Sequence, residues 1–265
     1  MIDSIDYGVI RLSVVPLRQE PSDASEMISQ LLFGEHYQVE EVSENGKWVR
    51  VINSFDQYEG WIDLKQHTSI SQEFYDQISN SDYRISTDKI SELSFQGQQH
   101  TISFGSILPL LSNPLFNQEE QINFSGKAKP IYTKLSRAAL IGFSKNLLNV
   151  PYLWGGRSSS GIDCSGFTQA LYRVGGYSLP RDSSQQILKG IEVELVSCIE
   201  GDLAFFTNKE GKMNHVGLVL QDQRIIHASG RVRIDKLDSN GIFNVEQNEY
   251  THHLFKVKSY LPVDQ

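Results

Sequence analysis

The sequence predicts an α+β protein in which one or two small β-barrels precede a compact C-terminal domain. Residues 1–67 contain short extended stretches separated by turns, and residues 68–132 contain similar stretches at less regular spacing. Residues 133–265 place helix-type apolar faces before strand-type stretches, which is an α+β order. The length of 265 residues is sufficient for two or three domains.

The first segment, residues 1–67, carries the signals of a small barrel. Asn45-Gly46 is a hairpin turn signal, and a β-rich stretch follows it at residues 48–52. Residues 31–42 alternate in part between apolar and polar side chains around a glycine turn. The polar stretch at residues 18–27 is long for so small a barrel, so it is either a functional loop or a solvated surface loop.

The second segment, residues 68–132, predicts a degenerate barrel. A short helix is expected at residues 71–78, and strands are expected at 90–95 and 100–108. Prolines 109 and 114 interrupt the pattern, and no Gly-Trp pair closes the segment as it does in the first.

The third segment begins with an apolar helix face over residues 138–148 and breaks at Pro151. Residues 179–187 are expected to be a loop that enters a further helix. Apolar stretches from residue 202 onward then predict an antiparallel sheet.

Cys164 is the candidate nucleophile of this segment. Asp163 before it is a good N-cap residue, so Cys164 is expected on the first turn of a helix. There the helix dipole would lower the thiol pKa toward the reactive thiolate. The alternative is that Cys164 is a small buried apolar residue. Four apolar residues follow at the spacing of one buried helix face: Phe167, Ala170, Leu171 and Val174.

Two histidines downstream are candidates for the base and for the group that orients it. His215 opens an extended stretch at residues 214–220, and His227 lies near the end of another at 224–229. The short connection between the stretches predicts a hairpin, which would bring both rings to one region. A nucleophile, a base and an orienting group are the parts that covalent catalysis requires.

Composition excludes several classes of partner. The net charge is −8, the isoelectric point is about 5.4, and no basic block is present. We therefore expect neither nucleic-acid binding nor attachment to an anionic membrane. The remaining histidines lack partners at metal-ligand spacing, so no metal or other cofactor is expected: His36, His67, His100, His252 and His253.

The cysteines and the first residues indicate a compartment. Only Cys164 and Cys198 are present, and Cys198 is expected in the core. Two unbridged thiols fit a reducing environment, and no signal peptide or membrane span is visible. The cytoplasm is therefore expected, although an exported chain without its signal would look the same. The sequence gives no expectation of oligomeric state.

Several motifs together resemble the NlpC-type cell-wall cysteine peptidases. In order they are Tyr152-x-Trp154-Gly155-Gly156, Asp163-Cys164-Ser165-Gly166-Phe167, Gly201-Asp202-Leu203, His215-Val216-Gly217 and His227-Ala228. The first segment resembles bacterial SH3-like domains through Leu31-x-x-Gly34-Glu35, Trp48-Val49-x-Val51 and Gly60-Trp61-Ile62. The resemblance implies a papain-like C-terminal domain preceded by one or two small SH3-like β-barrels.

The resemblance also implies the roles of residues. Cys164, His215 and His227 match the family's Cys-His-His triad, and the Cys164 amide is expected to contribute to an oxyanion hole. Tyr152 matches a tyrosine near that hole; the alternative is simple packing against Trp154.

One branch of the family carries SH3-like domains and cuts peptidoglycan stem peptides between γ-D-glutamate and the diamino acid. That branch needs a free N-terminal L-alanine, and a free ammonium group calls for a carboxylate. Glu26 and Asp163 are the candidates, with Tyr58 as a neighbouring donor. Ser165 and Ser183 match positions that contact the peptide. The expected partner is therefore a small murein peptide, lysine- or diaminopimelate-containing, in cell-wall recycling.

Three alternatives remain open from the sequence. The domain could be an endopeptidase acting on intact wall, or an acyltransferase on the same fold. It could also be an inert domain in a wall-binding module, because SH3-type grooves bind extended ligands.

Overall fold

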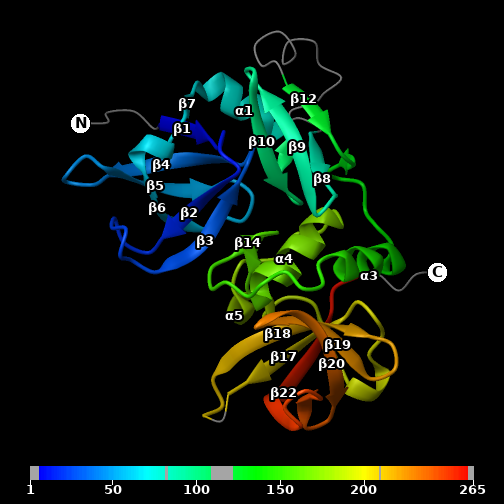
Figure 1. Cartoon of the computed structure of the whole chain (residues 1–265). Helices are drawn as coiled ribbons and strands as arrows, with labels where there is room; N and C mark the ends of the chain where they lie inside the picture. The colour runs from blue at the N-terminus through cyan, green and yellow to red at the C-terminus, as the bar shows by residue number, and fades with distance from the viewer. Residues whose placement is uncertain (1–5, 81–82, 109–121, 209, 262–265) are drawn as a thin grey trace. The chain divides into compact units, whose positions relative to one another are not determined.

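The computed structural model describes residues 6–80, 83–108, 122–208 and 210–261, which form two compact units (Figure 1). The first unit comprises the described residues up to Thr133 together with Trp154–Ser159. The second comprises Lys134–Leu153 and the described residues from Ser160 onward. Trp154–Ser159 lies within the predicted third segment, but it groups with the first unit.

The first unit begins with an antiparallel sheet of seven strands, in the order β3-β2-β6-β5-β4-β1-β7. The Asn45-Gly46 turn joins β4 to β5, and Gly46 has the positive φ of +67° that such a turn requires. Apolar side chains that include Val15, Tyr37 and Val51 form the core of this SH3-like barrel. Its elements are β1 (Asp6–Val9), β2 (Val14–Arg18), β3 (Met27–Leu32), β4 (His36–Val42), β5 (Trp48–Asn53), β6 (Glu59–Asp63), the 3-10 helix η1 (Leu64–Gln66) and β7 (Ser69–Ile70).

In the described residues, the rest of the first unit contains helix α1 and two small three-stranded sheets, β10-β9-β12 and β11-β8-β13. Predicted strands at 90–95 and 100–108 correspond to β9, β10 and β11, while residues 109–121, with both prolines, lie outside the described residues. The elements are α1 (Gln72–Asn80), β8 (Arg84–Ser86), β9 (Ile90–Phe95), β10 (Gln98–Ser103), β11 (Ile107–Leu108), β12 (Ile122–Ser125), β13 (Ala128–Pro130) and β14 (Arg157–Ser158).

The second unit places its helices first and its sheet afterwards. The sheet has the order β16-β22-β17-β18-β19-β20-β21, and β21 also pairs with β22, so the strands from β17 to β22 close on themselves. The elements are α3 (Arg137–Asn146), β15 (Gly161–Ile162), α4 (Cys164–Val174), α5 (Ser183–Gln186), β16 (Ile191–Val193), η2 (Leu195–Ser197), β17 (Leu203–Thr207), β18 (Met213–Leu220), β19 (Arg224–Ser229), β20 (Arg231–Asp238), β21 (Gly241–Asn244) and β22 (Glu249–Ser259).

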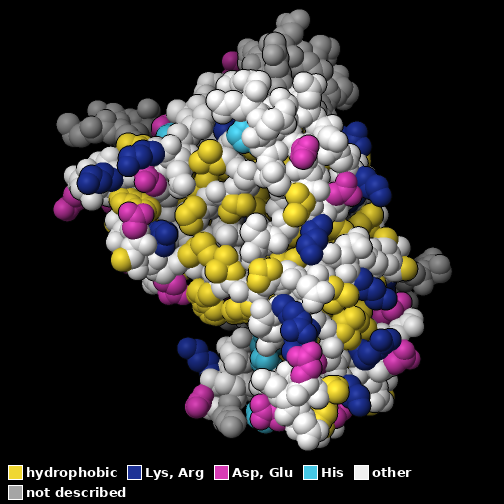
Figure 2. Space-filling model, viewed as in Figure 1, with side chains coloured by type: hydrophobic (Ala, Val, Ile, Leu, Met, Phe, Trp, Pro, Cys, Tyr) yellow, Lys and Arg dark blue, Asp and Glu magenta, His cyan; other side chains and the backbone are white. Residues whose placement is uncertain are grey.

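Helix α4 is the buried element of this unit, and it packs against β18 and β19. Every residue of α4 is buried, so both its apolar stripe and its polar side chains lie in the interior. Among the described residues, no helix has the length and apolar character needed to cross a bilayer. On the face shown in Figure 2, acidic and basic side chains are interspersed.

Candidate active site

The nucleophile helix begins at the predicted residue. Asp163 is the N-cap of α4, and its carboxylate accepts a hydrogen bond of 2.6 Å from the backbone N–H of Gly166. Cys164 is therefore the first helical residue, and it is 6% exposed. The cap satisfies one of the amides that a helix N-terminus leaves without a partner, which fixes where the helix starts.

A buried arginine holds the start of this helix. Arg181 donates to both carboxylate oxygens of Asp163, at 3.1 and 2.6 Å, and to the Ser165 hydroxyl at 2.9 Å. This ion pair could not be predicted from the sequence, because its partners are 18 residues apart. Since Arg181 neutralises Asp163 and engages Ser165, both predicted substrate contacts already have protein partners.

The predicted hairpin brings the two histidines together. Strands β18 and β19 are antiparallel neighbours, and Asp222 and Gln223 turn between them with positive φ values of 57° and 53°. His215 Nε2 lies 2.8 Å from His227 Nδ1, and both side chains are buried. Because Nε2 of His215 is occupied in this way, Nδ1 is its remaining nitrogen for proton transfer.

Cys164 lies against the start of β18. The backbone N–H of Val216, the residue after His215, bonds to the Cys164 thiol. Tyr152 lies within electrostatic range of Cys164, Asp163 and Arg181, and burial, followed by the charges of Cys164 and Asp163, raises its pKa. The structure therefore brings Cys164, His215, His227 and Tyr152 to one region of the second unit.

The protonation states differ from the sequence expectation. Burial raises the pKa of the Cys164 thiol to about 12, and the Asp163 carboxylate adds to the rise. Burial and the neighbouring rings of His252 and His227 lower the pKa of His215 well below its ordinary value. The expected lowering of the thiol pKa by the helix N-terminus is wrong here, because burial outweighs it. Both shifts favour a neutral thiol and a neutral imidazole.

The carboxylate of Asp235, which was not predicted from the sequence, contacts His227 on the side away from His215. Asp235 Oδ2 on β20 lies 2.9 Å from His227 Nε2, and Asp235 is 4% exposed. Arg233 contacts the same carboxylate at 2.8 and 3.0 Å. The sequence offered no signal for this contact, because the strand register that pairs His227 on β19 with β20 cannot be counted from the sequence.

His252, for which the sequence predicted no role, also belongs to this region. Its ring stacks on that of His215 with centroids 4.1 Å apart and an angle of 27° between the planes. Burial lowers the pKa of His252 to about 4. A neutral aromatic ring therefore covers one face of His215 near neutral pH.

Ser183 begins the short helix α5, which Asp182 caps with a capping box. Gln186 at the end of α5 donates to the Ser165 carbonyl oxygen at 3.0 Å and accepts from the Thr168 hydroxyl at 2.8 Å. These bonds fasten α5 to the first turn of α4. They place Ser183 on an element that is attached directly to the nucleophile helix.

Glu26 and Tyr58 belong to the first unit. The Glu26 carboxylate is exposed and accepts a hydrogen bond of 2.5 Å from Trp154 Nε1. Tyr58 packs against the barrel core with part of its surface exposed. Their assignment to substrate binding stays a prediction.

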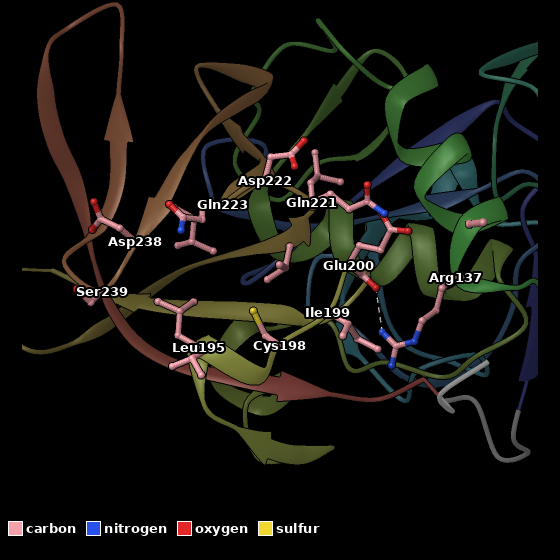
Figure 3. Close-up of a pocket in the computed structure, with 15 residues that line it drawn as sticks. Arg137, Leu195, Cys198, Ile199, Glu200, Gln221, Asp222, Gln223, Asp238 and Ser239 are labelled. Carbon is pink, nitrogen blue, oxygen red and sulfur yellow. Dashed lines mark hydrogen bonds between the residues drawn. The ribbon is translucent and has the colours of Figure 1, made fainter. Parts of the chain in front are cut away.

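Cys198 packs against the edge of the core of the second unit rather than inside it. It is half-buried and lines a pocket of about 1080 Å³ together with Leu195, Ile199 and Arg137 (Figure 3). In Figure 3 the Arg137 guanidinium reaches the Glu200 carbonyl oxygen, 3.0 Å away. The pocket lining includes none of Cys164, His215 and His227.

A buried thiol on the first turn of a helix, against a strand whose histidine is held by a second ring, defines a papain-like cysteine hydrolase. Comparison with protein families agrees with this class. Residues 149–254 match the NlpC/P60 family, and residues 17–66 match the bacterial dipeptidyl-peptidase Sh3 domain.

Two relatives match most of the chain. A gamma-D-glutamyl-L-lysine dipeptidyl-peptidase of Bacillus cereus is 30% identical over 270 residues, covering 91% of this chain and 77% of its own length. A Bacillus subtilis protein of the same name is 33% identical over 222 residues, covering 76% of this chain and 71% of its own. The crystal structure of an NlpC/P60 family protein from Bacillus cereus superimposes with a TM-score of 0.79 at 25% identity, covering 97% of this chain and all of the other.

This chain belongs to the NlpC/P60 family and is a cysteine peptidase.

Proposed function

We propose that the protein hydrolyses the bond between γ-D-glutamate and the diamino acid of peptidoglycan stem peptides that begin with a free L-alanine. The observation that carries this proposal is the similarity to gamma-D-glutamyl-L-lysine dipeptidyl-peptidases across both the barrel and the peptidase region. A match limited to the peptidase region would support hydrolysis of an amide but would say little about the substrate.

The catalytic steps follow from the arrangement of the groups. Cys164 attacks the carbonyl carbon while Nδ1 of His215 accepts the thiol proton, since the free pair is neutral. The Cys164 amide stabilises the oxyanion, and Tyr152 lies beside it as a further donor. Protonated His215 then gives its proton to the leaving amine, and water releases the acyl group from Cys164.

Recognition of the free amine is assigned to Glu26. An ammonium group binds best to a carboxylate that keeps its own charge available. Asp163 is neutralised by Arg181, whereas the Glu26 carboxylate is exposed and receives a neutral indole N–H. Tyr58, Ser165 and Ser183 remain the proposed polar contacts to the peptide.

The test is hydrolysis of L-Ala-γ-D-Glu-L-Lys beside its N-acetylated form, with Cys164→Ala as the inactive control. We expect release of L-Ala-D-Glu from the free peptide only. Glu26→Gln should raise KM for the free peptide, while Glu20→Gln, an exposed glutamate of the same loop, should leave it unchanged. Equal cleavage of both peptides would remove the amine requirement, and cleavage of neither would overturn the substrate.

The cellular role is proposed as recycling of wall peptides, because a free N-terminal L-alanine implies a peptide that has left its glycan. The cytoplasm is proposed as the compartment because Cys164 and Cys198 are unbridged. Fractionation of the native host, with detection of the protein, tests the compartment. Faster hydrolysis of intact wall than of the free peptide would instead identify an endopeptidase of the polymer.

A further inference from the structure

A continuous row of buried polar groups extends behind His215. His215 Nε2 contacts His227 Nδ1 at 2.8 Å, and His227 Nε2 contacts the Asp235 carboxylate at 2.9 Å. The three side chains come from the consecutive strands β18, β19 and β20 and are at most 4% exposed. Each nitrogen that joins this row therefore has one protein partner at hydrogen-bond distance.

The chemistry of the last group decides the direction of every bond in the row. A carboxylate only accepts hydrogen bonds, so His227 Nε2 must carry a proton. A neutral His227 then has a lone pair on Nδ1, and His215 must donate to it from Nε2. The lone pair of His215 is left on Nδ1, the nitrogen available to Cys164.

We propose that Asp235 is a positioning residue that fixes the tautomers of His227 and His215, so that His215 presents a proton-accepting Nδ1 to Cys164. The assignment also holds after proton transfer. Protonated His215 still donates from Nε2, so His227 must keep an acceptor at Nδ1 and a donor at Nε2 throughout the reaction.

Arg233 explains why the carboxylate remains ionised inside the protein. It contacts Asp235 Oδ2 through Nε at 2.8 Å and Oδ1 through a terminal nitrogen at 3.0 Å. Burial alone would raise the pKa of Asp235, but the bonds from His227 and Arg233 hold it below its ordinary value. Since Arg233 compensates the charge, Asp235 acts mainly as a fixed acceptor rather than as an unbalanced negative charge.

The competing explanation is that Asp235 and Arg233 form only a structural pair within the sheet. Arg233 does have further partners on β21 and beyond it, Asn244 at 3.1 Å and Glu246 at 3.1 Å. A structural pair would affect stability when either member is changed. It would not select the protonated nitrogen of a histidine.

The decisive variant is Asp235→Asn. Its amide oxygen takes the place of Oδ1, which accepts the hydrogen bond from the terminal nitrogen of Arg233, so its NH₂ group takes the place of Oδ2, faces His227 Nε2 and donates to it. His227 would then protonate at Nδ1 and His215 would carry its proton on Nδ1, where it cannot accept from the thiol. We expect kcat to fall by about 10²–10⁴-fold with KM changed less than about threefold, as when an orienting acid of a catalytic triad is replaced.

The matched control is Asp238→Asn on the same strand, whose carboxylate accepts from the Tyr250 hydroxyl. It should leave kcat within about twofold of wild type. Nitrogen-15 spectra of labelled histidine provide a reading that does not depend on substrate. In the wild type both His215 and His227 should be protonated at Nε2, and in Asp235→Asn both should be protonated at Nδ1.

The nitrogen-15 spectra also test the role of Asp235 independently of the proposed substrate. If the wild type cuts no stem peptide, the tautomers and the rate of Cys164 alkylation by iodoacetamide still test Asp235. Should Asp235→Asn fail to fold, Arg233→Gln keeps the carboxylate next to His227 and should preserve both tautomers. Unchanged tautomers in Asp235→Asn, or altered ones in Arg233→Gln with Asp235 intact, would overturn the inference.

Discussion

The buried ion pair between Arg157 and Glu35 is predicted to contribute strongly to the stability of the first unit. Arg157 is 1% exposed and meets both carboxylate oxygens of Glu35, at 3.1 and 3.3 Å. Arg157 also donates to the Gln30 carbonyl oxygen at 2.7 Å, and Glu35 accepts from the Leu32 N–H at 2.8 Å. The change Glu35→Gln keeps the shape of the side chain but leaves the Arg157 charge buried without its counter-charge.

Removing one partner of a buried ion pair costs about 3–5 kcal/mol, because the remaining charge stays desolvated. For a unit of this size that corresponds to a fall in melting temperature of roughly 10–20 °C. The control is Glu40→Gln in the same barrel, whose partner Arg50 is 37% exposed. An exposed pair of this kind contributes about 0–1 kcal/mol.

The assay is urea unfolding followed by fluorescence, with the double variant Glu35→Leu/Arg157→Met beside the single ones. We expect the double variant to recover most of the loss, because apolar pairs replace buried ion pairs with little cost. If Glu35→Gln cost no more than Glu40→Gln, the buried charge would have another compensating partner and the reasoning would be wrong.

Three further predictions concern two glycines near the site or the barrel and the half-buried His252. In Gly217→Ala the new Cβ would lie 2.9 Å from His227 Cβ. Because this contact would displace the His227 ring, kcat should fall about 10–100-fold. An unchanged kcat would show that β19 can move away without disturbing the ring. Gly155 has a φ of +75° and its added Cβ would meet a backbone carbonyl oxygen of β3, whereas Gly46 has a φ of +67° and open space around it. Thermal unfolding should therefore show a greater fall in melting temperature for Gly155→Ala than for Gly46→Ala. Equal falls would mean that the positive φ alone, and not the contact with β3, causes the destabilisation. The folded-state pKa of His252, about 4, lies below its ordinary 6.5, so the unfolded state binds more protons and stability falls as pH drops from about 6.5 toward 4. In urea unfolding, the free energy of unfolding of His252→Phe should fall by about 2 kcal/mol less than that of the wild type between pH 7.5 and pH 5. Equal falls in the two proteins would contradict the lowered pKa of His252.

The parts of the site that the sequence predicted are those fixed by local signals. Asp163 is a cap three residues before the amide it binds, so the start of α4 at Cys164 follows from neighbouring residues alone. The turn between His215 and His227 is equally local, and strand pairing across a short turn brings their rings together.

The missed parts depend on pairings that the sequence does not display. Arg181 reaches Asp163 through the path of a loop, and Asp235 reaches His227 through the register of a third strand. His252 arrives from the last strand of the sheet and stacks on His215. The thiol pKa was predicted wrongly for a related reason, because burial of Cys164 is a property of the folded chain rather than of its helix.

The grouping of Trp154–Ser159 with the first unit limits how this protein can be rearranged in evolution or by design. A fusion that transfers residues 134–265 to a different N-terminal domain would carry Arg157 without Glu35, and Trp154 without Glu26. The transferred piece would contain a complete nucleophile and base, but the buried cation Arg157, seven residues before the start of α4 at Cys164, would lack Glu35. Exchange of whole chains, or of both interacting segments together, preserves the catalytic half in a foldable form.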